Sequence, residues 1–288
     1  MRRLFIFLLL IMPVAASAQV LDIEVTGIAQ PTPVAVVPFG WEGRDAAPPL
    51  NVSTVITADL RRSGRFDPVA EDKMLQKPTD GQDVDFQDWG FVGVEAVIIG
   101  KLVQTDDNLF TLEFQLFDVV GRRQLLGYRM PRLTRATLRG GAHRAADMIY
   151  EKLTGIKGVF STRVAYVTAN QQGDGRLYSL VVADQDGFNK HTIMESTDPI
   201  MSPAWSPDSR QLAYVSFENN RSSIWVQTLR TGNRFRVSSE PGINGAPSFS
   251  PDGRKLVITL GGVDGNPDIY VPVSYTHLRA HETVLVIS

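Results

Sequence analysis

Apolar and polar positions follow two different rhythms along the chain, and the rhythm changes near Phe160. In the first part, apolar and polar side chains alternate over Leu109–Asp118, and this period of two predicts a half-buried strand. Apolar runs indicate three further strands at residues 34–39, 96–103 and 124–130. In the second part, short apolar runs are separated by turns rich in Gly, Pro and Asp, a pattern typical of an all-β fold.

Two stretches with a helical period complete the first part. Residues 51–63 begin with Asn51, a favourable N-cap, and carry apolar side chains on one face (Val52, Val55, Ile56 and Leu60). A second helix is predicted over residues 135–153, and Gly155 follows it as a terminator. This mixture predicts a small α+β domain over residues 34–157, with the helices covering one face of the sheet.

The second part repeats itself. Residues 202–215 return in closely similar form as residues 246–259, so Trp205 aligns with Phe249, and Asp208 with Asp252, 44 positions later. A period of this length with several short strands per unit is typical of β-propeller blades. We therefore expect an all-β propeller over residues 158–273, of which about two and a half blades are present.

The first 18 residues predict a signal peptide. Arg2 and Arg3 precede a short apolar run, and Ala16-Ser17-Ala18 matches a cleavage motif. The apolar run is shorter than the roughly 20 residues that span a membrane. We expect cleavage between Ala18 and Gln19, followed by export of the remaining chain.

Two segments stand apart from both parts. Residues 19–33 mix apolar and polar side chains and end in Pro31-Thr32-Pro33, so the pattern indicates an extended arm, either an edge strand or a frayed terminus. Residues 274–288 match no earlier repeat. We interpret them as a non-native tail that arose by a frameshift, a fused sequence or an assembly error.

The composition offers little catalytic chemistry. The chain has 288 residues, a net charge of −2 and no cysteine, which gives no electrostatic reason for nucleic-acid binding and excludes disulfides and thiolate sites. Neither H-E-x-x-H nor G-x-S-x-G occurs, so we expect no catalytic site, no cofactor and no metal. His143 is expected at the surface, on a solvated basic helix face with Arg135, Arg139 and Arg144.

The chain resembles the TolB family of the Tol–Pal system. The resemblance rests on the signal peptide, the arm, the α/β domain containing Val36-Val37-Pro38-Phe39 and the blades with Ser-Pro-Ala-Trp-Ser-Pro-Asp. The resemblance covers about residues 1–271 and implies a six-bladed propeller in the periplasm. It further implies a non-enzymatic adaptor that binds the lipoprotein Pal and the C-terminal domain of TolA, maintains outer-membrane integrity and supports cell division.

The resemblance also assigns candidate binding residues. The arm occupies the place of the family's TolA-binding segment, which here comprises Gln19, Val20, Leu21, Asp22, Ile23, Glu24, Val25, Thr26, Gly27, Ile28, Ala29 and Gln30. The propeller loops that resemble the Pal-binding face contain Met201, Ser202, Ile243, Asn244, Gly245 and Ala246. Ile243 departs from the family, because a histidine is common at that position.

One alternative belongs to another class of protein. Similar blades occur in exported propeller-type serine peptidases, in which a hydrolase domain with a G-x-S-x-G motif follows the propeller. On this hypothesis the chain would be the N-terminal portion of such an enzyme.

Overall fold

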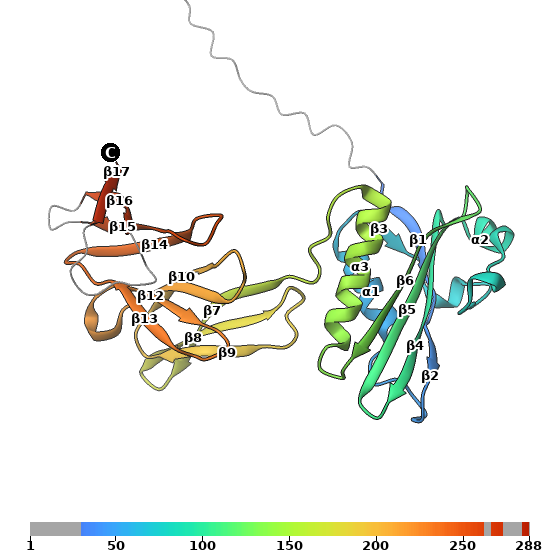
Figure 1. The fold of residues 1–288 in the computed structure, drawn as a ribbon, viewed down its shortest axis with the longest axis horizontal. Helices are drawn as coiled ribbons and strands as arrows, with labels where there is room; N and C mark the ends of the chain where they lie inside the picture. The colour runs from blue at the N-terminus through green and yellow to red at the C-terminus, as the bar shows by residue number, and fades with distance from the viewer. Residues whose placement is uncertain (1–29, 262–265, 273–283, 288) are drawn as a thin grey trace, which may run out of the picture.

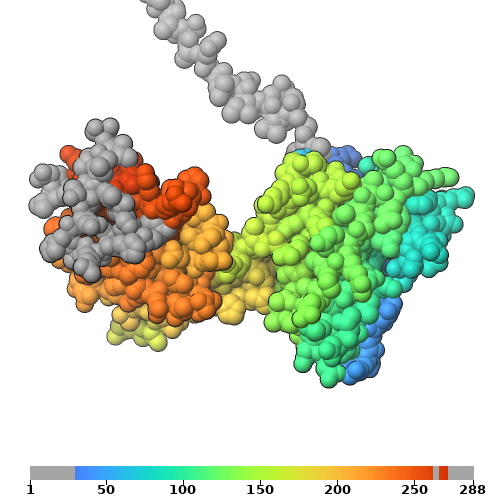
Figure 2. Space-filling model, viewed as in Figure 1, coloured from blue at the N-terminus to red at the C-terminus, as the bar shows by residue number. Residues whose placement is uncertain are grey.

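The computed structural model describes residues 30–261, 266–272 and 284–287. They form two lobes, which Figure 1 and Figure 2 show side by side with a narrow connection between them. The predicted signal peptide, its cleavage position and all of the arm except Gln30 and the Pro31-Thr32-Pro33 end lie outside the described residues.

The first lobe is built on a mixed six-stranded sheet in the order β3-β1-β4-β5-β6, with β2 paired to β4. Strand β1 runs parallel to both β3 and β4, whereas β4, β5 and β6 are joined as antiparallel hairpins. The strands are β1 (Thr32–Val36), β2 (Gly40–Glu42), β3 (Phe66–Pro68), β4 (Ala96–Asp106), β5 (Leu109–Asp118) and β6 (Arg123–Leu133). The alternation over β5 is confirmed as the pattern of a sheet strand.

Helices cover both faces of this sheet. On one face α1 (Val52–Arg62) and α3 (Leu138–Thr154) pack against each other and against the main core cluster. On the other face α2 (Phe86–Val92) inserts Trp89 into a second, smaller core. The α+β class is confirmed. The expectation that helices cover only one face was wrong, because α2 covers the other. Helix α2 was not predicted, since it is too short to give a helical period.

The local sequence explains where the two long helices begin and end. Asn51 caps α1, since its side-chain oxygen accepts the backbone N–H of Thr54 at 3.2 Å. Helix α3 ends at Gly155, whose positive φ of 72° suits a residue without a Cβ. Three short 3₁₀ turns complete the helical elements of the described residues: η1 (Glu71–Lys73), η2 (Gly81–Asp83) and η3 (Glu218–Asn220).

The second lobe consists of three antiparallel sheets. The first contains β7 (Arg163–Gln172), β8 (Gly175–Asp184) and β9 (His191–Ser196), and the second contains β10 (Ile200–Trp205), β11 (Gln211–Ser216), β12 (Ser223–Thr228) and β13 (Arg234–Ser238). The third contains β14 (Ile243–Phe249), β15 (Leu256–Gly261), β16 (Pro267–Pro272) and β17 (Val284–Ile287). Strand β17, from the segment interpreted as a non-native tail, pairs antiparallel with β16.

Apolar side chains fill the space between successive sheets, as expected for propeller blades. One cluster joins the first and second sheets and contains the fully buried Tyr214, whose hydroxyl donates to the side chain of Gln227 at 3.0 Å. Burial raises the pKa of the Tyr214 hydroxyl. A second cluster, which includes Val226 and Ile258, joins the second and third sheets. The predicted blade architecture is confirmed.

The repeated Ser-Pro-Asp motif forms the same turn twice. In the second sheet Asp208 accepts hydrogen bonds from the Ser206 hydroxyl at 2.7 Å and from the backbone N–H of Arg210 at 3.1 Å. In the third sheet Asp252 accepts the corresponding bonds from Ser250 and Arg254. The serine hydroxyl, followed by the backbone donor, holds the pKa of each aspartate below its usual value.

Candidate partner-binding surfaces

Both blade loops that were singled out from the sequence contain a β-bulge. The register of β10 against β11 shifts between Met201 and Ala204, and the register of β14 against β15 shifts between Gly245 and Ser248. Such bulges bend a strand and redirect its side chains.

Each bulge holds a residue with a Cβ in the left-handed region. Ser202 has a φ of 50° and Ala246 a φ of 45°, at equivalent positions of successive blades. Backbone of this kind costs about 1–3 kcal/mol per residue and persists only where the surroundings impose it. The same strained position recurs because the two blades repeat the same bulge.

Apolar side chains are exposed beside these bulges. Met201 is 49% exposed and Ile243 is 53% exposed, although both belong to strands of the propeller. Opposite Ile243 lies Gly261, where a Cβ would come within 3.0 Å of the Ile243 side chain. Strands β10 and β14 are in contact, so the two exposed side chains belong to neighbouring blades.

Asn244 lies beneath this surface rather than on it. Its side chain is 1% exposed, accepts hydrogen bonds from the Ser238 hydroxyl (2.6 Å) and the Glu240 N–H (3.0 Å), and donates to the Glu240 carbonyl (2.7 Å). Its backbone N–H donates to the hydroxyl of Ser222 at 2.9 Å. Of the six propeller residues predicted from the sequence, Asn244 therefore positions the loop, while Met201, Ser202, Ile243 and Ala246 are exposed and Gly245 is half-buried.

The arm reaches the first lobe at one margin of its sheet. Gln30 is exposed, and immediately after Pro31 the backbone N–H of Thr32 donates to the carbonyl of Arg65 at 2.9 Å. Strand β1, which starts there, pairs with β3 at the end of the strand order. The chain preceding β1 is thus anchored at Thr32, a short distance from the end of the predicted binding segment.

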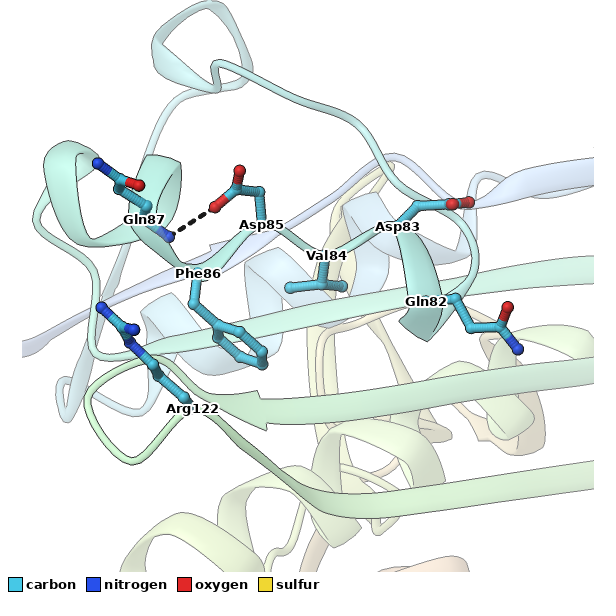
Figure 3. A pocket seen from close by; sticks show the side chains of 7 residues that line it. All are labelled: Gln82, Asp83, Val84, Asp85, Phe86, Gln87 and Arg122. Carbon is cyan, nitrogen blue, oxygen red and sulfur yellow. Dashed lines mark hydrogen bonds between the residues drawn. The ribbon is translucent and has the colours of Figure 1, made fainter.

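A separate polar pocket lies at the other side of the first lobe, and no part of it was singled out from the sequence. Its volume is about 410 Å³, and Figure 3 shows the side chains that line it: Gln82, Asp83, Val84, Asp85, Phe86, Gln87 and Arg122. Asp85 caps α2 by accepting the N–H of Gln87 at 2.8 Å. This lining holds no serine, cysteine, histidine or lysine that could act as nucleophile or base beside the carboxylates.

The two lobes meet at a buried group of charged side chains, and here the expectation for His143 was wrong. The His143 ring on α3 is 1% exposed, because Asp59 of α1 lies on one side of it and the turn between β8 and β9 on the other. From that turn Asp186 pairs with Arg139, and the guanidinium of Arg139 also lies 3.6 Å from the ring centre of Phe188. The helix face predicted to be solvated is therefore partly an interface.

This buried group brings potential metal ligands together, but the charge beside them disfavours a cation. The ligand atoms of His143, Asp184 and Asp186 lie within 4.8 Å of one another. However, Arg139 donates to Oδ2 of Asp186, the oxygen that lies 3.4 Å from His143 Nε2, and its positive charge would repel a cation. We assign no metal to this position.

Among the described residues no helix is long and apolar enough to cross a membrane.

Comparisons with known proteins agree with both lobes. Residues 21–125 match the model of the TolB amino-terminal domain, and residues 150–279 match that of the TolB beta propeller domain. A Tol-Pal system protein TolB from Thioalkalivibrio sulfidiphilus is 48% identical over 245 residues, covering 85% of this chain and 56% of the relative. The corresponding protein from Nitrosococcus oceani is 50% identical over 229 residues, covering 79% and 52% respectively.

A solved structure shows the same arrangement of elements. The crystal structure of TolB from Acinetobacter baumannii matches with a TM-score of 0.78 and 37% identity, covering 90% of this chain and 61% of that one. The chain spans about half the length of the curated relatives it matches. These relatives match across both lobes and carry the name of a Tol-Pal protein, which favours the TolB family over the peptidase alternative.

Proposed function

The chain belongs to the TolB family, and on that premise we propose that it serves in the Tol–Pal system of the cell envelope as a periplasmic adaptor without catalytic activity. The observation that carries the proposal is the match to named Tol-Pal relatives across both lobes. We propose two partners. Pal would bind the propeller face, and the C-terminal domain of TolA would bind the arm.

The bulged surface of β10 and β14 supports the Pal part of the proposal. Its exposed apolar side chains, Met201 and Ile243, stand on a backbone that the strands and the Asn244 hydrogen bonds hold in place. A preformed apolar patch loses little conformational freedom when it is covered, and this favours affinity. The strained positions at Ser202 and Ala246 are then part of the shape that the partner recognises.

The sequence of the arm supports the TolA part. Residues 19–30 alternate apolar side chains with polar ones over Leu21–Val25 and contain no proline, so they suit addition as a strand to a partner's sheet. In that mode the main chain supplies the hydrogen bonds and alternate side chains supply specificity. A protein that joins Pal to TolA in this way would help to maintain the outer membrane and support constriction at division.

Pal binding can be tested at a single exposed side chain. We expect Ile243→Asp to weaken binding of Pal to the chain at least tenfold in isothermal titration calorimetry, because a carboxylate replaces an apolar contact at the patch. Ser248→Ala is a matched control, since Ser248 is exposed on the same strand beyond the bulge. Equal Pal affinity for Ile243→Asp and the unaltered chain would remove this patch from the proposed Pal surface.

A further inference from the structure

The junction of the two lobes holds one histidine between two carboxylates. His143 Nδ1 lies 2.6 Å from Oδ2 of Asp59, and His143 Nε2 lies 3.4 Å from Oδ2 of Asp186. The side chains of His143, Asp59 and Asp186 are 2%, 0% and 4% exposed, so water screens them little. Asp59 belongs to the first lobe and Asp186 to the propeller, which means that the ring bridges the lobes.

The contacts of the ring decide where its protons lie. A distance of 2.6 Å to a carboxylate requires an N–H at Nδ1, because two acceptors would repel each other at that separation. A neutral ring would then present a bare lone pair at Nε2 to the buried oxygen of Asp186, and Nε2 has no hydrogen-bond partner of good geometry. A second proton at Nε2 turns this repulsion into attraction.

The charges around the ring lead to the same result. Three carboxylates face it: Asp59 from α1, and Asp184 and Asp186 from the end of β8 and the turn that follows. Two guanidinium groups accompany them, Arg62 at 3.4 Å from Asp59 and Arg139 on Asp186. With His143 neutral the group carries one uncompensated negative charge, and an imidazolium balances it.

A divalent cation fits this position less well than a proton. It would compete with Arg139 for Asp186, and it would leave the group with an excess of positive charge. A proton on Nε2 requires neither the displacement of Arg139 nor a change in the contact between His143 and Asp59.

We propose that His143 is doubly protonated in the closed arrangement and acts as an ionic clasp that fixes the propeller against the first lobe. Loss of the ring proton releases the clasp, because Nε2 then repels Asp186. Other direct contacts between the lobes remain without it: the side chain of Gln185 donates to Asp59 at 3.2 Å, and Arg139 pairs with Asp186 and stacks on the Phe188 ring. The lobes are still expected to move apart or vary in orientation as the pH rises.

On the acid side the clasp depends on Asp186. Burial alone would raise the pKa of this carboxyl, but the hydrogen bonds from Arg139 and from the N–H of Phe188, with the charges of Arg139 and His143, hold it below the usual value. Asp186 therefore stays ionised somewhat below the pH at which an ordinary aspartate is protonated. The clasp therefore stays closed as the pH falls toward that limit.

The chain contains no cysteine, so two introduced ones can be labelled without interference. We would place spin labels at Gln87→Cys on α2 and Arg236→Cys on β13, both exposed positions in different lobes, and measure the distance between them against pH. A narrow distribution at mildly acidic pH that broadens as the pH rises is the expected result. His143→Leu should give the broad distribution at every pH, and Arg144→Ala, an exposed neighbour on α3, should behave like the unaltered chain.

A second measurement does not depend on the folding of any variant. The ¹⁵N shifts of the His143 ring in the unaltered chain should show protons on both nitrogens under the conditions that give the narrow distribution. A neutral ring there, or a distance distribution that does not change with pH, would overturn the proposal. Binding of added Zn²⁺ with a shift of the His143 signals would overturn it as well, in favour of a metal centre.

Discussion

Replacement of Asn244 by alanine tests whether the proposed Pal surface is held in shape by one buried amide. The substitution removes three short side-chain hydrogen bonds, to the Ser238 hydroxyl, the Glu240 N–H and the Glu240 carbonyl, and two long ones of 3.5 Å, to Ser222 and Gly242. Each such bond contributes about 1 kcal/mol net. Since Glu240 is exposed and water can replace part of what it loses, we expect a loss of about 2–3 kcal/mol in local stability.

Amide hydrogen exchange measures this loss directly. A change of about 1.4 kcal/mol corresponds to a tenfold change in an equilibrium constant, so amides of β13 and β14 should exchange roughly 30–150 times faster in Asn244→Ala. Amides of β4 and β5 in the other lobe should be unaffected, and Ser248→Ala serves as the control on the same strand. If the amides of β14 exchange at rates within about twofold of those in the unaltered chain, Asn244 does not stabilise the bulge, because the bulge then holds its shape without it.

Two further predictions concern backbone and charge. Gly93→Ala, directly after α2, should destabilise the chain by about 1 kcal/mol, because Gly93 has a φ of 83°. Gly90→Ala in the helix interior should instead stabilise the chain by about 0.5–1 kcal/mol. Added methyl groups meet no neighbour at either position, and urea denaturation compares the two variants. A same-sign effect for both would contradict this. The hydrogen bond from the Ser206 hydroxyl holds the pKa of Asp208 below that of an ordinary aspartate. Ionised Asp208 therefore stabilises the fold at a pH above the ordinary aspartate pKa, and this stabilisation is lost as the pH falls through the lower pKa of the folded state. An NMR titration should show this depression weakened in Ser206→Ala, and an identical Asp208 titration in both proteins would exclude the hydroxyl as its cause.

The sequence predicted those parts of the fold that depend on local signals. Asn51 at the start of α1 and Gly155 after α3 act within a single turn of chain, and both behave as expected. The repeat that aligns Trp205 with Phe249 likewise records a unit that packs only against its neighbours. Helix α2 was missed because seven residues are too few for a helical period, although Asp85 before it and Gly93 after it are recognisable cap signals.

The features that depend on distant parts of the chain could not be predicted in this way. Ser202 and Ala246 adopt a conformation that normally calls for glycine, and only the register of the paired strands imposes it on them. His143 lies on a helix face that looks polar and solvated, yet the turn around Asp186, more than 40 positions later, covers it. Periodicity shows which face of a helix is polar, but not what packs against that face.

Isothermal titration calorimetry can show whether the proposed arm binds TolA. The TolA C-terminal domain would be titrated into the chain beginning at Gln19 and into the same chain beginning at Pro31, which retains the anchoring strand β1. We predict binding to the first and none to the second, with the same melting temperature for both. Equal affinity for the two would contradict the account, because TolA would then recognise some other part of the protein.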